Sequence, residues 1–312
     1  MGCSGLSGAS SEQRKRRQAG KVECMEMSDS LPEILRRKII ARALPEGGFP
    51  SSPGGQYRPD ASAWAILALT SAGEDQNLLE AARSRLAADQ LEDGRICVSK
   101  NHPQAFWPTA LAVLAWQNTP THGKSEQKGI DFLLQTSEKL CISLRGWPWI
   151  GDTHSWVEPT SLVLMAFKVA GKGKHPRAEE GRRMLIDLQL ENGGWNYGNT
   201  EIFGQQLRPM PESTGLALSA LAGTTKRESV GKSLFYLKRE MSRLETPLSF
   251  GWGCLGLSAW GERPEIQQDA LLNSLRRQEI CGNHTTEELS LLLIALEGRN
   301  GFLGLSGTVS DQ

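Results

Sequence analysis

Apolar and polar positions alternate along this chain in blocks of helical length. Six blocks of ten residues are apolar almost all round and rich in Ala and Leu. Each of them has Ala followed by a large apolar residue at its last two positions. They span residues 60–69, 107–116, 158–167, 212–221, 251–260 and 287–296. A helix of this kind is buried on every side, so the pattern predicts six core helices.

Six further segments have one polar face and alternate with the apolar ones. They span residues 31–43, 77–90, 124–137, 176–190, 226–241 and 264–279. In the fourth, Met184, Leu185 and Leu188 share one helical face and charged residues occupy the rest, which is typical of an amphipathic helix. Gly193 predicts where this helix ends, because glycine readily adopts the left-handed conformation that follows a helix.

The end of this fourth segment carries a spacing that recurs elsewhere. Leu185, Gln189, Gly193 and Trp195 follow one another, and similar Gly-aromatic endings close other polar-faced segments. The period is about 35 to 55 residues, a length typical of one supersecondary repeat. The pattern predicts an all-α (α/α)6 toroid of six helical hairpins, with an apolar inner ring and an amphipathic outer ring. The ring is expected to be closed, because an open array would expose an apolar end. An open solenoid of the TPR or HEAT type is the alternative.

The boundaries of this pattern predict one folded domain. Residues 29–300 are expected to form the toroid. Residues 1–28 are polar and rich in Gly and Ser, and are expected to be a disordered N-terminal tail. Residues 301–312 are expected to form a C-terminal tail.

The spacing of Leu185, Gln189, Gly193 and Trp195 resembles the QW repeat of squalene-hopene and oxidosqualene cyclases. The apolar inner helices resemble those of the wider terpenoid cyclase and protein prenyltransferase superfamily, and the resemblance covers about residues 31–298. It implies an isoprenoid-processing protein that binds a polyprenyl substrate in a central apolar cavity, with acid-initiated cyclisation. The alternatives are a non-catalytic toroid that binds a lipid or a protein partner, and one subunit of a heteromeric enzyme. The expected ligand is an isoprenoid or other apolar small molecule, with peripheral membrane contact as a further option.

The cyclase family begins one inner helix with the catalytic motif Asp-x-Asp-Asp-Thr-Ala. The matching stretch of this chain runs from Arg58 to Ala63, and Asp60 falls on the position of the proton-donating Asp. Both flanking acids of the motif are missing. A lone Asp is a weaker proton donor to an alkene than the family's acid cluster.

The zinc ligands of the prenyltransferases are largely absent from this chain. Cys254 has no Asp two residues before it, and Glu288 stands about where the family's His is expected. Because a catalytic zinc site needs three protein ligands, we predict no metal and no cofactor. Cys254, His284 and Glu288 are the one alternative metal set that the sequence offers.

The register of the inner helices aligns several acids at one position. Asp60, Glu158 and Glu212 each open an inner helix and are the predicted catalytic residues, and Glu287 shares their position. Burial and neighbouring like charges would raise the pKa of such a group and make it a proton donor. Helix capping is the alternative, because acids complement the positive end of a helix dipole. A proton relay from His154 to Glu158 is a further hypothesis.

Aromatic residues gather at the same ends of the predicted inner helices. Aromatic faces stabilise carbocations, so they are the predicted substrate-binding residues. They are Tyr57, Phe106, Trp107, Trp149, Trp156 and Trp252. Trp195 is instead expected to pack within the scaffold. Arg58, Arg145 and Arg208 are candidates to bind a diphosphate.

The charge balance and the cysteine content limit the binding partners and the cellular location that we expect. Lys plus Arg and Asp plus Glu both number 35, which offers no electrostatic reason to expect nucleic acid. The six cysteines include no CxxC pair, which is typical of reduced thiols, so we predict a cytoplasmic location. No apolar run reaches the ~18 residues that a membrane-spanning helix needs.

Overall fold

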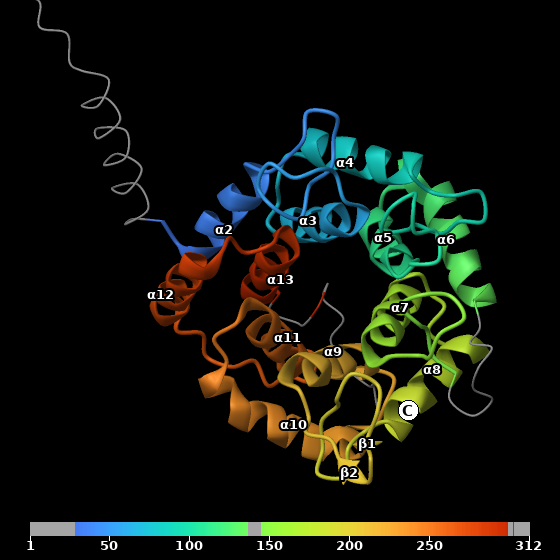
Figure 1. Cartoon of the computed structure of the whole chain (residues 1–312), viewed down its shortest axis with the longest axis vertical. Helices are drawn as coiled ribbons and strands as arrows, with labels where there is room; N and C mark the ends of the chain where they lie inside the picture. Colours follow the sequence, from blue (N-terminus) through green and yellow to red (C-terminus); the bar gives the residue numbers. More distant parts are fainter. Residues whose placement is uncertain (1–28, 137–144, 299–301, 303–312) are drawn as a thin grey trace, which may run out of the picture.

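The computed structural model describes residues 29–136, 145–298 and Phe302. Six helices form an inner ring and six an outer ring (Figure 1). The inner helices are α3 (Pro59–Ser71), α5 (Pro108–Trp116), α7 (Val157–Val169), α9 (Pro211–Leu221), α11 (Pro247–Ser258) and α13 (Thr286–Glu297). The outer helices are α2 (Leu31–Ile40), α4 (Gln76–Ala88), α6 (Gly123–Gln135), α8 (Pro176–Asp187), α10 (Arg227–Glu240) and α12 (Gln268–Gln278). The all-α (α/α)6 prediction is confirmed.

Short elements interrupt the helical hairpins. Three 3-10 turns cover Pro120–His122, Met241–Arg243 and Glu279–Cys281. Strands β1 (Glu201–Ile202) and β2 (Gln205–Gln206) form a small antiparallel pair on the loop between α8 and α9. The predicted N-terminal tail, and all of the predicted C-terminal tail except Phe302, lie outside the described residues.

The ring is closed by contacts between its first and last hairpins. Each inner helix contacts the next, and α13 contacts α3 (Figure 1). The backbone N–H of Thr286 donates to the Ser51 carbonyl at 2.7 Å, and Arg42 Nη2 donates to the His284 carbonyl at 2.8 Å. An open solenoid would leave these groups apart. The closed toroid, and not the solenoid alternative, is therefore the fold.

Burial follows the hydrophobic pattern closely. Nearly every side chain of the inner helices is buried, whereas the outer helices bury one face. The largest boundary errors are four residues, at α11, which begins before the predicted 251, and at α12, which begins after the predicted 264. Pro247 suits the first helical turn, and the Thr246 side chain accepts a hydrogen bond from the Ser249 backbone N–H. Both signals were missed because this hairpin carries only part of the repeat.

The segment around Trp195 is a structural fastener. Its indole Nε1 donates to the Leu185 carbonyl at 2.6 Å, and its backbone N–H donates to Thr214 Oγ1, on α9, at 3.0 Å. Gln189 Nε2 donates to Ser233 Oγ on α10, the next outer helix, at 2.8 Å. Gly193 has a φ of 90°, as the helix-ending signal predicts. The segment thus ties α8 to the inner ring and to its outer neighbour.

The same fastener recurs in other hairpins. A backbone N–H that follows an outer helix donates to a Ser or Thr hydroxyl in the first turn of the next inner helix. The pairs are Phe49 with Ser62, Ile96 with Thr109, and Trp147 with Thr160. Because four hairpins share this junction, the inner helices α3, α5, α7 and α9 run in one direction and begin at one end of the ring.

Parallel inner helices give the ring an electrical polarity. Acids occupy the first turns of α3, α7, α9 and α13. At the other end, basic side chains donate to the last carbonyls of the inner helices. The pairs are Arg83 with Ala115, Lys168 with Ala222, Arg227 with Trp260, and Arg263 with Leu296. Acids at helix N-termini and bases at C-termini both complement the helix dipole.

Replacing Gly215 by Ala is expected to destabilise the ring by about 1–3 kcal/mol, because it overpacks the contact between α9 and α11. A Cβ at Gly215 would lie 2.1 Å from the Trp252 carbonyl oxygen. Gly231 is the matched control, because it lies on the exposed face of α10 and a Cβ there would meet open space. Gly231→Ala should stabilise by up to about 1 kcal/mol through helix propensity. Denaturant unfolding measures the free energy of unfolding of both variants. An equal change in the two variants would refute the close contact at Gly215.

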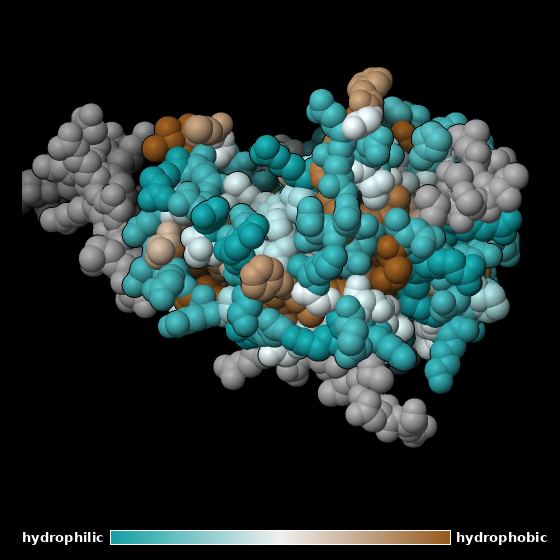
Figure 2. Space-filling model, turned by 90° about the horizontal axis from the view of Figure 1, so that it is seen from below, coloured by the Kyte–Doolittle hydropathy of each residue, from teal (hydrophilic) through white to brown (hydrophobic). Residues whose placement is uncertain are grey.

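The side of the ring that is seen in Figure 2 is largely hydrophilic. Figure 2 shows one side, where hydrophilic residues cover most of the surface and hydrophobic residues appear in scattered places. Within the described part of the chain, none of the helices has both the length and the apolar character that crossing a membrane requires.

Candidate active site at the acidic end of the ring

Four acids stand at the end of the ring where the inner helices begin. They are Asp60 on α3, Glu158 on α7, Glu212 on α9 and Glu287 on α13. Because α7 neighbours α9 and α13 neighbours α3, the acids interact as two pairs. Glu158 faces the charge of Glu212, and Glu287 faces that of Asp60. The register predicted from the sequence thus brings all four acids to one end.

The first pair contains a carboxyl group whose pKa lies near neutral pH. Burial, with a smaller contribution from the negative charge of Glu212, raises the pKa of Glu158 to about 7. Glu212 accepts hydrogen bonds from Tyr197 Oη at 3.1 Å and Ser249 Oγ at 2.8 Å. The pair therefore combines Glu158, whose pKa is raised, with a hydrogen-bonded acceptor, Glu212.

The second pair has a different arrangement. Asp60 is 2% exposed. Its two carboxylate oxygens accept one hydrogen bond each from Arg58, from Nε at 2.9 Å and from Nη2 at 2.6 Å. This bidentate ion pair fixes the orientation of the Asp60 carboxylate. Burial, followed by the charge of Asp60, raises the pKa of Glu287, which also accepts a hydrogen bond from Ser51 Oγ at 2.9 Å. Proton donation by Asp60, which stays a prediction, would require its ion pair with Arg58 to break.

The predicted aromatic residues divide into separate groups. Trp107 and Trp149 form an edge-to-face pair, with ring centroids 5.2 Å apart, and both are partly exposed. Phe106 is buried against Phe132 of outer helix α6, also at 5.2 Å. Tyr57 lies under the guanidinium of Arg85 on outer helix α4. The structure does not join these residues into one continuous wall.

The other two predicted aromatic residues lie apart from these groups. The ring of Trp156 lies against Gly198, where a Cβ would be 2.8 Å from the indole. Trp252, on α11, is buried and meets Trp64 of α3, with centroids 5.9 Å apart. The two helices that carry Trp252 and Trp64 flank α13, so the rings meet on the inner side of the ring.

Two members of this aromatic group were not predicted as site residues. Phe302 is fully buried, with its ring 5.4 Å from Trp252 and 5.9 Å from Trp64. Trp64 carried a usable signal, because a bulky ring between Ala63 and Ala65 stands out in an inner-helix segment. Phe302 carried none, because it lies in what the sequence predicts to be a tail. Its contacts place this one residue of the predicted tail inside the ring.

The other polar candidates have partners of their own. Arg58 is paired with Asp60, and Arg145 Nη1 lies 3.6 Å from Glu180. Burial raises the pKa of the Cys254 thiol to about 12, and His284 Nδ1 lies 3.9 Å from Glu288. Among the residues that the structure describes, no three His, Cys, Asp or Glu side chains gather as a metal site would require.

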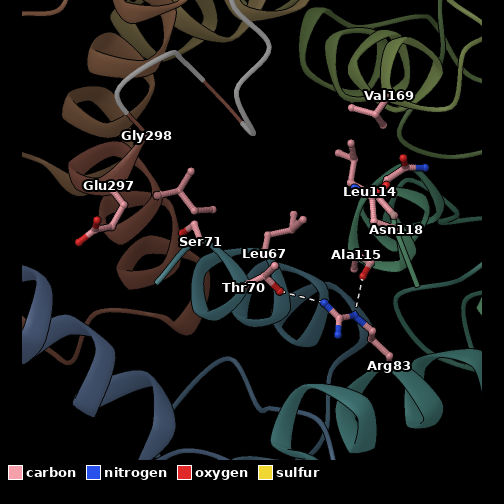
Figure 3. A pocket seen from close by; sticks show the side chains of 12 residues that line it. Leu67, Thr70, Ser71, Arg83, Leu114, Ala115, Asn118, Val169, Glu297 and Gly298 are labelled. Atoms are coloured by element: carbon pink, nitrogen blue, oxygen red, sulfur yellow. Dashed lines mark hydrogen bonds between the residues drawn. The ribbon is translucent and has the colours of Figure 1, made fainter. Parts of the chain in front are cut away.

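Two cavities open on the ring away from the Glu158–Glu212 pair. One, of 490 Å³, lies among the C-terminal ends of inner helices and includes Leu67, Leu114, Val169 and Ile294 in its lining (Figure 3). The other, of 570 Å³, lies beside the first two hairpins and includes Tyr57 in its lining. Of the aromatic residues predicted to bind substrate, Tyr57 lines the second of these cavities, and the first cavity is lined by none of them. From Glu158 to Val169 the helix rises about 16 Å at 1.5 Å per residue, so the first cavity and the acids are at opposite ends.

Known proteins share this fold and part of the sequence. The sequence matches no protein-family model. It is 26% identical over 179 residues to a drimenyl diphosphate synthase of Streptantibioticus cattleyicolor, a match that covers 54% of this chain. The chain spans only about a third of the length of that relative, 33%.

Solved structures with the same architecture are more distant in sequence. One is a protein from Actinoplanes, with a TM-score of 0.62, 14% identity and coverage of 86% of this chain and 98% of that chain. Another is an inactive variant of the α-1,6-mannanase GH76A of Salegentibacter sp. HEL1_6 in complex with α-1,6-mannotriose. Its TM-score is 0.60 at 11% identity, with the same coverage. The chain therefore has an α/α toroid fold, which it shares with these solved structures.

Replacing Glu158 by Gln is expected to change stability in a pH-dependent way. The pKa of Glu158 rises from its ordinary 4.5 to about 7 on folding, so the folded state binds the proton more tightly. The wild-type free energy of unfolding therefore loses this contribution as pH rises from about 4.5 to about 7. Allowing for partial exposure, the loss is about 2 kcal/mol. The variant should match the wild type at pH 4 and exceed it by about this amount at pH 8. Denaturant unfolding at both pH values measures the difference, and a pH-independent difference would contradict the raised pKa.

Proposed function

We propose that this protein processes an isoprenoid by protonating a polyprenyl chain at the acidic end of the ring. The observation that carries the proposal is the raised pKa of Glu158 beside Glu212, on a fold that resembles terpenoid cyclases. The sequence relationship to a drimenyl diphosphate synthase makes an isoprenoid diphosphate the first substrate class to test. Glu158 is assigned as the proton donor, Glu212 as its partner, and Asp60 as an ion-paired acid of the same ring.

The proposed step transfers the Glu158 proton to an alkene carbon. The π electrons form the new C–H bond, the positive charge appears on the neighbouring carbon, and Glu158 becomes a carboxylate. Attack by a second double bond closes a ring, and loss of a proton from the final cation to a base ends the reaction. A carboxyl group with a pKa of about 7 keeps its proton in about half of the molecules at neutral pH, and it is a weak acid. The reaction therefore depends on surroundings that stabilise the cation.

Aromatic rings supply that stabilisation in the proposal. The faces of Trp64 and Trp252 offer negative quadrupole potential to a cation. Trp64 lies four residues after Asp60 and so about one helical turn deeper in the ring. The apolar inner helices beside it keep water away from a reactive intermediate.

A non-catalytic toroid that binds a lipid or a protein is the second candidate. One observation favours it, because Phe302 is buried against both Trp64 and Trp252. A chain that already fills this aromatic group with its own side chain has less room there for a polyprenyl substrate. In this candidate the acids serve as helix caps.

One experiment separates the two candidates. Purified protein is incubated with farnesyl diphosphate, geranylgeranyl diphosphate and squalene, and products are analysed by mass spectrometry. Lipids retained by the untreated protein are identified in parallel. Cyclic products support the first candidate. Retained or bound polyprenyl compounds without turnover support the second. If the protein neither converts nor binds any of these compounds, the isoprenoid assignment is overturned.

A further inference from the structure

The cavity at the opposite end of the ring contains a buried cation. Arg83, on α4, is 4% exposed and lines the 490 Å³ cavity. Its Nε donates to the Ala115 carbonyl and its Nη2 to Thr70 Oγ1, both at 2.9 Å (Figure 3). These bonds use two of the five N–H donors of a guanidinium. The remaining three have no partner among the described residues.

Among the residues that the structure describes, no carboxylate compensates this charge. Within the part of the chain that the structure describes, Arg83 has no acidic group within ion-pair distance. The acid that acts on it is Glu80, one turn earlier on α4, and the Glu80 carboxylate is hydrogen-bonded to His122 Nε2 at 3.1 Å. Glu297, also at the cavity, lies on α13 with its side chain directed away from Arg83 (Figure 3). A guanidinium stays charged at physiological pH, and an unpaired buried charge is costly.

The rest of the cavity lining combines apolar side chains with a few polar groups. Leu67, Leu114 and Ile294 are buried core residues of three inner helices, and Val169 ends a fourth. Thr70 and Asn118 add polar groups near Arg83 (Figure 3). The volume is within the range of about 300–1,000 Å³ that is usual for small-molecule sites. An apolar surface beside one unpaired cation matches a ligand with a hydrocarbon part and an anionic head.

We propose that this cavity binds a small amphiphile whose phosphate or carboxylate head contacts Arg83 and whose hydrocarbon part packs on Leu67, Leu114 and Ile294. The site is separate from the acidic end and does not depend on the proposed catalysis. Arg83 offers the planar donor fork that suits either anion. Its bond to the α5 terminus holds the guanidinium in position while leaving the other donors for the ligand.

Calorimetric titration of the whole chain tests the proposal. The probes are decyl phosphate and decanoate, with decanol and decyltrimethylammonium as head-group controls. Both anions are expected to bind, the cation is not, and decanol should bind at least about tenfold more weakly, because hydrogen bonds to charged groups contribute about 1.5–3 kcal/mol. The tighter of the two anions identifies the head group. Equal binding of decanol and the anions, or no binding by either anion, would overturn the proposal.

Two variants and one matched control test the location. Arg83→Gln should weaken anion binding by about tenfold or more. Val169→Trp fills the cavity and leaves Arg83 unchanged, so it should also abolish binding. Lys168→Gln removes a basic group that donates to the Ala222 carbonyl at the end of α9, and should leave binding unchanged. Circular dichroism confirms that each variant is folded. Wild-type affinity in folded Arg83→Gln, or in folded Val169→Trp, would place the ligand elsewhere.

Discussion

Replacing Glu158 by Gln is expected to lower kcat/KM for an accepted polyprenyl substrate by about 10²–10⁴-fold, the usual contribution of a general acid. Gln has nearly the same shape and cannot donate a carboxyl proton. Because the pKa of Glu158 is about 7, the wild-type rate should fall as pH rises above this value. The variant should lose this pH dependence together with the rate. Product formation measured from pH 5 to 9 tests both expectations.

Two comparison variants make this result specific. Glu126→Gln is the matched control, because burial also raises the pKa of Glu126, but that residue lies on outer helix α6. It should retain wild-type turnover. Asp60→Asn tests the acid that the sequence resemblance favours. Full activity in Glu158→Gln, combined with loss of activity in folded Asp60→Asn, would transfer the proton-donor role to Asp60.

Trp195→Ala is expected to destabilise the ring by about 3–5 kcal/mol, the usual cost of truncating a buried Trp. Trp195 is fully buried, and its indole is hydrogen-bonded to the Leu185 carbonyl. The substitution leaves a cavity at the junction of α8 and α9 and an unpaired carbonyl at the end of α8. A loss of this size is a large part of the stability of a typical domain. Denaturant unfolding measures the change.

Two further variants separate the contributions to this loss. Trp195→Phe keeps most of the ring but loses the indole donor, so it should cost less than Trp195→Ala. Trp149→Ala removes an equally large but partly exposed ring at the acidic end, and should destabilise much less. If Trp149→Ala and Trp195→Ala had equal effects, the assignment of Trp195 as a structural fastener would be wrong.

The sequence by itself determined the architecture. Inner helices had to be apolar on every side and outer helices on one side, so hydrophobic periodicity separated the two rings. The repeated Gly-aromatic spacing then set the register of the hairpins. That register placed Asp60, Glu158, Glu212 and Glu287 at one end, where the structure has them. These features are local or repeat along the chain, and a sequence records them directly.

Only the tertiary structure decided what each of these groups touches. Asp60 and Glu158 occupy equivalent positions, yet one is held by Arg58 while the other is half-buried beside Glu212. The partners come from loops and neighbouring helices, and their distances depend on ring closure. The same holds for Phe302 against Trp64, and for Arg83, which the packing of the ring leaves without a counter-charge among the described residues. Local pattern predicts where a helix begins, but electrostatic environment depends on residues that are distant in the chain and close in space.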